Sequence, residues 1–386
     1  MSVTEHPEPD KVEGAPHPRE TKRLIGQDAA EAAFLDAFNS GRLHHAWLLT
    51  GPRGVGKATL GWSIARFLLA TPDGDDDGGL FGDAPSKPIS LKIDLEHLVA
   101  RRIMAGSDPG LKVIRRGGAG STDSDREKNL RDGKFSKDIR ISEIRELTPF
   151  LSLSATEGGR RVVIVDAADE MNVQAANALL KMLEEPPAKT TMLLVAHQPS
   201  RLLPTIRSRC RELRLSPLSP ANMAAALEQA DVAVEPGQQE GLAALSGGSV
   251  GEAVRLINLG GLEIYAELVG LLGDLPKLDR SRALKLAEAV ATRGAEEKLD
   301  LLIALIEIFL ARMARAGALG HAEAQEGAGG EAALFARVAP NAQVARRWAE
   351  LAEKLGGRIR HGRAVNLDPA ALILDTILKI RDTAAG

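Results

Sequence analysis

Hydrophobic residues follow two alternating patterns between residue 24 and about residue 215. Short, mostly apolar runs predict buried strands at residues 46–50, 111–114, 161–165 and 192–195. Apolar residues at helical spacing predict helices at residues 28–39, 58–69, 141–150 and 172–185. Strands that alternate with helices in this order indicate an α/β fold, in which helices cover both faces of a parallel sheet.

The pattern becomes helical after Pro217. Helical segments dominate residues 220–258, 280–315 and 331–382, with a glycine- and alanine-rich connector at 316–330. We therefore predict an α/β domain, a small helical domain and a helical C-terminal domain, over residues 21–215, 216–275 and 276–386. Residues 1–20 are acidic and proline-rich, and we expect a disordered leader there. Two polar stretches predict mobile surface loops, at residues 71–90 and 115–137.

Composition excludes several classes of function. The 386 residues carry a formal net charge of -3 and only 3% aromatic residues, which argues against a stand-alone nucleic-acid-binding module with base-stacking platforms. Cys210 is the single cysteine, so neither a disulfide framework nor a four-cysteine zinc site can form, and we expect a cytoplasmic protein without zinc. The longest apolar stretch, residues 299–313, contains Asp300 and Glu307, so we expect no membrane span.

The octapeptide GPRGVGKA, which begins at Gly51, nearly matches the phosphate-binding loop G-x-x-x-x-G-K-[ST] between a predicted strand and a predicted helix. Gly51, Gly54 and Gly56 would let backbone N–H groups surround a phosphate, and Lys57 would neutralise it. Ala58 lacks the hydroxyl group that coordinates Mg²⁺. Two alternatives stay open: a loop that binds a nucleotide such as ATP, and a loop kept only for its fold.

A second candidate site lies where the run RVVIV ends in Asp166, a carboxylate that could hold Mg²⁺. The next residue, Ala167, cannot act as a general base, a loss that typically lowers a rate by about 10²- to 10⁴-fold. His197 follows the last predicted strand and reads as an ordinary loop residue, although it could donate a hydrogen bond. The alternative for Asp166 is a turn residue without a metal.

The stretch LLPTIRSRC ends in Ser208, Arg209 and Cys210. Together with HHAWLLTGP at residues 44–52 and NALLKMLEEPP at residues 177–187, it resembles the AAA+ clamp-loader family of bacteria. The resemblance covers about residues 21–260 and implies a P-loop parallel-sheet domain, a small helical lid and an all-α collar. It also implies that Arg209 acts in trans on the ATP of a neighbouring subunit, because a planar, permanently charged guanidinium suits a phosphate that gains charge.

Within that family, the gamma/tau motor needs the hydroxyl, the glutamate and a sensing arginine. Here Ala58, Ala167 and Gly251 stand at those places, which resembles the non-hydrolysing delta-prime type. The resemblance implies partners of the gamma/tau and delta types, with the sliding clamp and primed DNA reached through the assembly. It also implies a part in a DNA polymerase holoenzyme, a nucleotidyltransferase, without intrinsic ATPase activity. The rival hypothesis is an active AAA+ ATPase such as gamma/tau.

Overall fold

The computed structural model describes residues 7–71, 87–152, 159–292, 294–322 and 325–386. The chain divides into two compact units. Unit 1 comprises Met1–Val232 and Gly248–Gly251, and unit 2 comprises Ala233–Gly247 and Glu252–Gly386.

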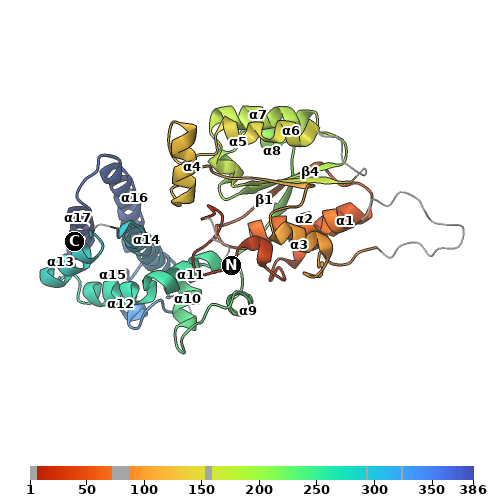
Figure 1. Ribbon diagram of the computed structural model, residues 1–386. Helices are drawn as coiled ribbons and strands as arrows, with labels where there is room; N and C mark the ends of the chain where they lie inside the picture. The colour runs from red at the N-terminus through yellow and green to blue at the C-terminus, as the bar shows by residue number, and fades with distance from the viewer. Residues whose placement is uncertain (1–6, 72–86, 153–158, 293, 323–324) are drawn as a thin grey trace, which may run out of the picture. The chain divides into compact units, whose positions relative to one another are not determined.

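Unit 1 is built on a five-stranded sheet of order β2-β3-β4-β1-β5 (Figure 1). All its strand pairs are parallel. The strands are β1 (Ala46–Thr50), β2 (Leu111–Ile114), β3 (Arg161–Asp166), β4 (Thr190–Ala196) and β5 (Arg211–Arg214). The central strands β1 and β4 are buried throughout, as near-continuous apolar sequences in a doubly covered parallel sheet should be. The four predicted strands and the α/β class are confirmed.

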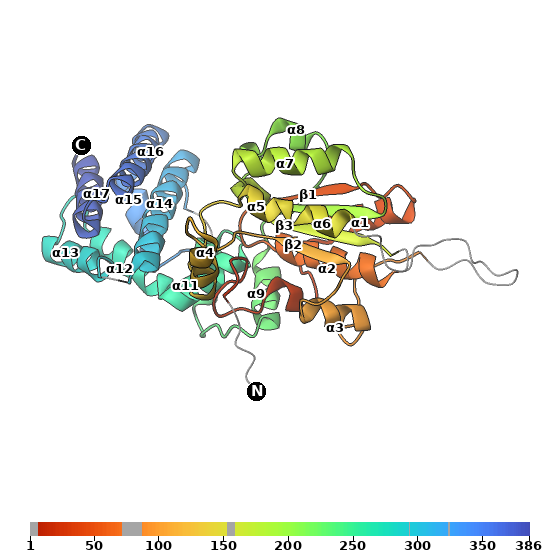
Figure 2. The same cartoon turned by 45° about the horizontal axis from the view of Figure 1, so that its top comes forward.

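Helices cover both faces of this sheet (Figures 1 and 2). The helices of unit 1 are α1 (Asp28–Asn39), α2 (Lys57–Ala70), α3 (Leu98–Met104), α4 (Asp123–Arg131), α5 (Ile141–Arg145), α6 (Leu147–Ser152), α7 (Val173–Glu184), α8 (Pro204–Arg207) and α9 (Pro220–Gln229). Short 3-10 turns lie at Pro18–Glu20, Ala168–Glu170 and Pro199–Arg201. On the α7 side of the sheet, Leu179 and Leu183 of α7 share a buried core with Val163 and Leu194 of the strands.

Three sequence predictions for unit 1 need correction. The helix predicted over 141–150 is two helices, because Pro149 has no N–H to donate to the carbonyl group of Arg145. The loop predicted over 115–137 contains α4, which Thr122 caps and which carries acidic residues in its first turn. The strand β5 was not predicted, because only Leu213 in it is buried. Most of the loop predicted at residues 71–90 lies outside the described residues.

The N-terminal segment also differs from expectation. Residues 1–6 lie outside the described residues, but residues 7–20 are held by ion pairs and a buried histidine, His17. Glu8 and Asp10, which gave the segment its polar composition, are the residues that form these ion pairs. Ion pairs, rather than a run of apolar residues, hold the first part of this segment.

The described residues of unit 2 form helices joined by turns and loops, without a strand. Its helices are α10 (Gln239–Ser246), α11 (Val250–Leu259), α12 (Gly261–Leu272), α13 (Arg280–Ala289), α14 (Glu296–Leu319), α15 (Glu331–Val338), α16 (Ala342–Ala364) and α17 (Pro369–Ala385). The first two residues of α11, Val250 and Gly251, belong to unit 1. The two longest, α14 and α16, pack on each other. Gly317 permits a close approach there, since a Cβ atom on it would lie 3.0 Å from Cβ of Ala345.

A buried ion pair joins α14 to α15 in unit 2. Nε of Arg312 lies 2.9 Å from Oε1 of Glu331, and both side chains are almost fully buried. The hydroxyl group of Tyr265 also donates to Glu331, as does the backbone N–H of Gly327 at 2.6 Å. These donors satisfy both carboxylate oxygens, which a buried charge requires. Among the described residues, no helix has the length and apolar character to cross a membrane.

Candidate functional site

The phosphate-loop sequence forms a tight turn between β1 and α2. Its three glycines, Gly51, Gly54 and Gly56, have φ angles of 139°, 74° and 101°, a backbone conformation that residues other than glycine rarely adopt. A Cβ atom on Gly51 would also collide with the carbonyl oxygen of Leu215, which follows β5. The turn therefore needs glycine both for its backbone angles and for its contact with the next strand.

Lys57, the first residue of α2, is only 3% exposed. Its Nζ donates a hydrogen bond to the carbonyl oxygen of Gly51 at 2.7 Å and another to that of Pro52. Burial lowers the pKa of Lys57 to about 8. The ammonium group is thus held by carbonyl groups of its own loop.

Residues 249–251 of unit 1 lie directly on the phosphate loop. The backbone N–H of Gly251 donates to the carbonyl oxygen of Gly54 at 3.3 Å, and a Cβ atom on Gly54 would lie 2.9 Å from that nitrogen. A Cβ atom on Gly251 would lie 3.1 Å from Cα of Gly54, and one on Gly54 would collide with the hydroxyl oxygen of Ser249. Two glycines therefore face each other where the family resemblance implied a sensing arginine.

Asp166 ends β3 at the carboxyl edge of the sheet, where the phosphate loop also begins. Burial raises the pKa of Asp166 to about 7, and the charges of Asp10 and Glu170 act in the same direction. The neighbouring Ala167 is 4% exposed and offers no proton acceptor in its side chain. The carboxyl group of Asp166 is the one in this β3 sequence that could hold a divalent cation.

Two acidic residues beyond β3 are already engaged. The carboxylate of buried Asp169 accepts backbone N–H groups of His197 and Gln198, at 3.0 and 2.8 Å, and so ties the end of β4 to the turn after β3. Glu170 pairs with Arg116 at 3.0 Å and with Arg53 at 3.5 Å. Both carboxylates are therefore bound by other groups of the chain.

His197 carries a buried Nδ1 atom without a hydrogen-bond partner. Burial, with the nearby cations Lys57 and Arg53, lowers the pKa of His197 to about 4. The imidazole is therefore neutral at physiological pH, and it adds no positive charge to the phosphate loop.

Arg209 lies between α8 and β5, at the amino-terminal ends of the parallel strands, whereas Lys57 lies beyond their carboxyl-terminal ends. Arg211 pairs with Trp47 near the start of β1, whereas the phosphate loop begins after Thr50, beside Arg214. These two ends of the strands are roughly 15 Å apart, the length of a five-residue strand. The structure therefore brings the phosphate-loop glycines, Lys57 and Asp166 to one end and puts Arg209 at the other.

The guanidinium group of Arg209 is held near the end of α7. Its Nη2 lies 2.8 Å from Oε1 of Glu184, and its Nη1 donates to the carbonyl oxygen of Thr205 at 3.0 Å. The side chain is 36% exposed, so it remains accessible. Cys210 packs against the α7 core, and burial raises the pKa of its thiol to about 12.

The sequence did not identify Arg115, or the acidic residues that contact it, as residues of the site. Ile114 at the end of β2 pairs with Val165, so Arg115 follows beside Asp166. Glu8 and Asp10 bind this arginine, although more than one hundred residues separate them from it in the sequence. A local motif cannot reveal such a contact; the topology of the sheet was needed.

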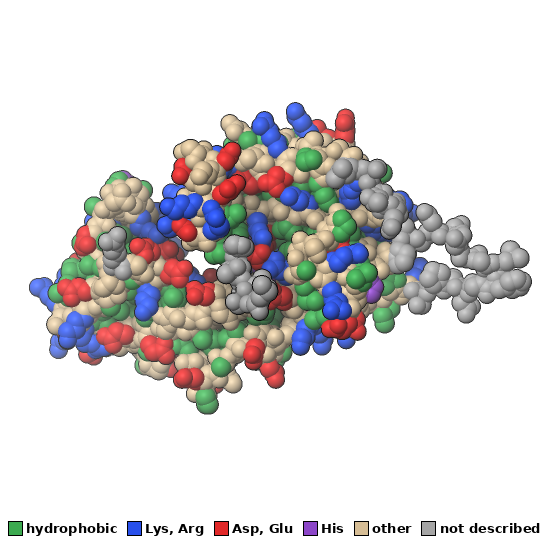
Figure 3. Space-filling view, in the orientation of Figure 1, with side chains coloured by type: hydrophobic (Ala, Val, Ile, Leu, Met, Phe, Trp, Pro, Cys, Tyr) green, Lys and Arg blue, Asp and Glu red, His purple; other side chains and the backbone are tan. Residues whose placement is uncertain are grey.

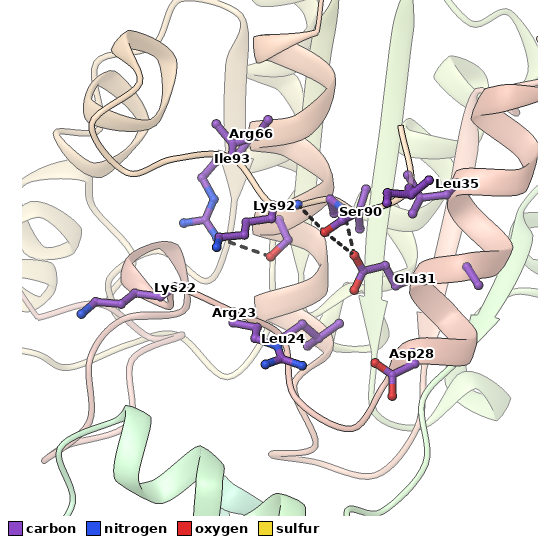
Figure 4. Close-up of a pocket in the computed structure, with 14 residues that line it drawn as sticks. Lys22, Arg23, Leu24, Asp28, Glu31, Leu35, Arg66, Ser90, Lys92 and Ile93 are labelled. Atoms are coloured by element: carbon purple, nitrogen blue, oxygen red, sulfur yellow. Dashed lines mark hydrogen bonds between the residues drawn. The ribbon is translucent and has the colours of Figure 1, made fainter. Parts of the chain in front are cut away.

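A separate pocket of about 300 Å³ lies on the α1–α2 side of unit 1 (Figure 4). Glu31 of α1, Arg66 of α2 and the cations Lys22, Arg23 and Lys92 are among its lining residues. Oε1 of Glu31 accepts the N–H of Leu91 at 2.8 Å and so fixes the segment that borders the pocket. The five predicted nucleotide-site residues do not line this pocket.

Basic and acidic side chains are interspersed over the face shown in Figure 3. This mixture agrees with the formal net charge of -3 for the whole chain. The drawn face therefore lacks the continuous basic stripe that is typical of nucleic-acid-binding surfaces.

Comparisons with known proteins bear on this arrangement. The delta-prime subunit of DNA polymerase III from Pseudomonas aeruginosa is 39% identical over 58% of this chain, and that of Escherichia coli is 32% identical over 57%. The matched regions span 59% and 56% of those two proteins. A gamma/tau subunit from Mycobacterium tuberculosis is 30% identical over 72% of this chain and 45% of its own length.

One solved structure, a gamma-subunit-related protein of Thermotoga maritima, covers 91% of this chain and 99% of its own chain, at 17% identity and a TM-score of 0.42. The sequence model of the family described as DNA polymerase III, delta subunit, matches residues 26–219, which is half of the chain. This match includes the phosphate loop, Asp166 and Arg209, and it shows that the chain belongs to that family.

Proposed function

We propose that this chain is a delta-prime-type subunit of a bacterial clamp loader, which does not hydrolyse ATP and which donates Arg209 to the ATP site of a neighbouring subunit. The proposal rests on the separation of Lys57 and Arg209 at opposite ends of the strands. Lys57 is bound by its own loop at one end, and Arg209 is accessible at the other. A residue at that end is suited to a neighbour's triphosphate and not to its own.

The altered residues support the absence of hydrolysis. Ala58 offers no hydroxyl to Mg²⁺, Ala167 offers no base, and Gly251 faces Gly54 where a phosphate-sensing arginine would need space. Identity to the two delta-prime relatives, at 39% and 32%, exceeds that to the gamma/tau relative, at 30%. These observations favour the delta-prime type over the rival gamma/tau motor.

The assembly follows from the same proposal. Gamma/tau and delta subunits would be the direct partners, and the sliding clamp and primed DNA would be reached through the complex in the cytoplasm. Residues 216–275 would serve as the small lid and residues 276–386 as the collar, without zinc in the chain. As part of a DNA polymerase holoenzyme, the chain would contribute to nucleotide transfer without catalysing it.

The test is ATP turnover by a loader reconstituted with Arg209→Ala. An arginine supplied in trans is worth roughly 10³- to 10⁵-fold at the site it serves, so the loader should lose the share of its rate which that site carries. Arg207→Ala, an exposed arginine on α8, is the matched control and should leave the rate unchanged. An unchanged rate with Arg209→Ala would refute the role of this arginine.

A second measurement separates this proposal from the motor hypothesis. The isolated chain should show no ATP turnover above background, and Lys57→Ala should not change that result. Steady-state hydrolysis that disappears in Lys57→Ala would instead establish a working ATPase.

A further inference from the structure

The N-terminal segment forms a charged cluster around Arg115. Nη1 of Arg115 lies 2.7 Å from Oδ1 of Asp10, and Nη2 lies 2.7 Å from Oε1 of Glu8. Asp10 is 3% exposed and Glu8 is 15% exposed. Nε2 of the buried His17 lies 3.1 Å from the other oxygen of Asp10. Both nitrogens of one guanidinium fork are thus bound by carboxylates.

This cluster lies at the candidate nucleotide site. Arg115 follows β2 beside Asp166, and the charge of Asp10 contributes to the raised pKa of Asp166. Further along the segment, Val12 approaches Gly251, since a Cβ atom on this glycine would lie 4.0 Å from Cγ2 of Val12. The segment therefore runs from the β2–β3 edge of the site to the residues that cover the phosphate loop.

Helix α2, which begins with Lys57, fixes the other end of the segment. Arg66 of α2 donates to the carbonyl oxygens of Arg19 and Thr21, at 2.7 and 2.9 Å. His17 packs edge-on against Trp62 of the same helix, with 5.4 Å between the ring centroids. These contacts hold the acidic residues at the site while leaving residues 8–12 attached mainly through charge.

Glu8, Asp10 and His17 lie close enough together to resemble a cation site. Their charges are already balanced, however, because Arg115 binds both carboxylates and Arg19 binds Glu8 at 2.9 Å. The residue here whose ligand could be exchanged for an external one is the guanidinium of Arg115. Arginine binds carboxylate and phosphate oxygens with the same two-pronged geometry, so the two kinds of anion can exchange.

We propose that Arg115 is an anion-binding residue of the phosphate-loop site, and that the carboxylates of Glu8 and Asp10 occupy it as an internal ligand in competition with nucleotide phosphates. Nucleoside diphosphates and triphosphates are the ligand class. This inference concerns the chain's own site, goes beyond the donated arginine, and stands or falls independently of Arg209.

The test uses the purified 386-residue chain and a fluorescent ADP analogue, with binding followed by anisotropy. Glu8→Gln with Asp10→Asn should lower the dissociation constant of the analogue about ten-fold or more. The phosphates of the analogue then no longer compete with carboxylates for Arg115. The matched control is Glu228→Gln with Asp231→Asn, which removes the same charge from two exposed residues of unit 1 and should bind like the wild type. Adding Arg115→Ala to the first pair should abolish the gain.

A folded Glu8→Gln/Asp10→Asn variant that binds no tighter than the wild type would overturn the proposal. So would a gain that survives Arg115→Ala. If the double variant does not fold, hydrogen exchange of the wild type with inorganic tripolyphosphate decides the matter. Saturating tripolyphosphate should speed amide exchange in residues 7–17 several-fold, and unchanged exchange there would refute the competition.

Discussion

Nη2 of Arg209 lies 2.8 Å from Oε1 of Glu184, at the C-terminal end of α7. Both side chains are more than one-third exposed, so the ion pair contributes only about 0 to 1 kcal/mol to stability. The proposed exchange of Glu184 for a triphosphate of a neighbouring subunit would therefore cost little free energy. If Arg209 acts in trans as proposed, this ion pair would hold the guanidinium in place without preventing its release.

Glu184→Gln should leave the free energy of unfolding within about 0.5 kcal/mol of the wild type, because an exposed pair contributes little. Urea denaturation followed by circular dichroism measures this. A loss above about 2 kcal/mol would show that the ion pair is a structural element of the α7–α8 region.

Gly54→Ala should destabilise unit 1 more than Gly41→Ala. Both glycines have φ near 70°, so both variants carry the backbone penalty of about 1 kcal/mol. Only Gly54 also faces Ser249 and Gly251, whereas a Cβ atom on Gly41 meets nothing within 4 Å. The additional clash should add about 1 to 3 kcal/mol in denaturant unfolding. Equal losses in the two variants would mean that residues 249–251 do not bear on the phosphate loop in solution.

Asp10→Asn should destabilise the chain in a pH-dependent way. Although burial opposes it, bonding to His17 and Arg115 lowers the pKa of Asp10 to about 2, from 3.8. Because the native pKa is depressed, the stabilisation is present above about pH 4 and is lost as the pH falls towards 2. The difference in unfolding free energy should be about 2 kcal/mol at pH 6 and should shrink below pH 4.

Thermal or urea unfolding of wild type and Asp10→Asn at several pH values checks this sign. Glu228→Gln, on the exposed side of α9, should give no such pH-dependent difference. A difference for Asp10→Asn that stays constant down to pH 2 would show that Asp10 is not ionised against Arg115.

Glu331→Gln should destabilise unit 2 by about 3 to 5 kcal/mol, because it leaves the guanidinium of Arg312 buried without its counter-ion. Glu267→Gln is the matched control in the same unit. Its partner Arg282 lies 3.0 Å away, and both side chains are 44% exposed, so the loss should stay below about 1 kcal/mol. Similar losses in the two variants would contradict the burial of the Arg312–Glu331 pair.

The sequence predicted those parts of the fold that depend on local hydrophobic patterns. Apolar runs such as residues 161–165 are buried on both faces of the sheet and therefore predict a strand. β5 escaped detection because it is charged at three of its four positions, and α4 because capping and charge stabilise it in place of an apolar face. Patterns of burial could not reveal elements that bury little.

The residues of the candidate site likewise divide into those that local motifs predict and those that only the fold brings together. The phosphate-loop glycines, Lys57 and Asp166 belong to short motifs next to strands, so the sequence could single them out as candidates. Arg115 entered the site only because β2 lies beside β3, and Asp10 only because the chain returns to that edge. Neither relationship has a local signature, and the self-contained bonding of Lys57 could not be inferred from a motif that normally binds phosphate.

The bonds of Lys57 to the carbonyl groups of Gly51 and Pro52 have a consequence for how such a subunit behaves over time. Loops that depend on a bound triphosphate change shape as it is consumed. A lysine that donates to carbonyl groups of its own loop does not need a bound triphosphate to hold it in place. In the proposed clamp loader, a phosphate loop held in this way would give the hydrolysing subunits a fixed surface against which to move.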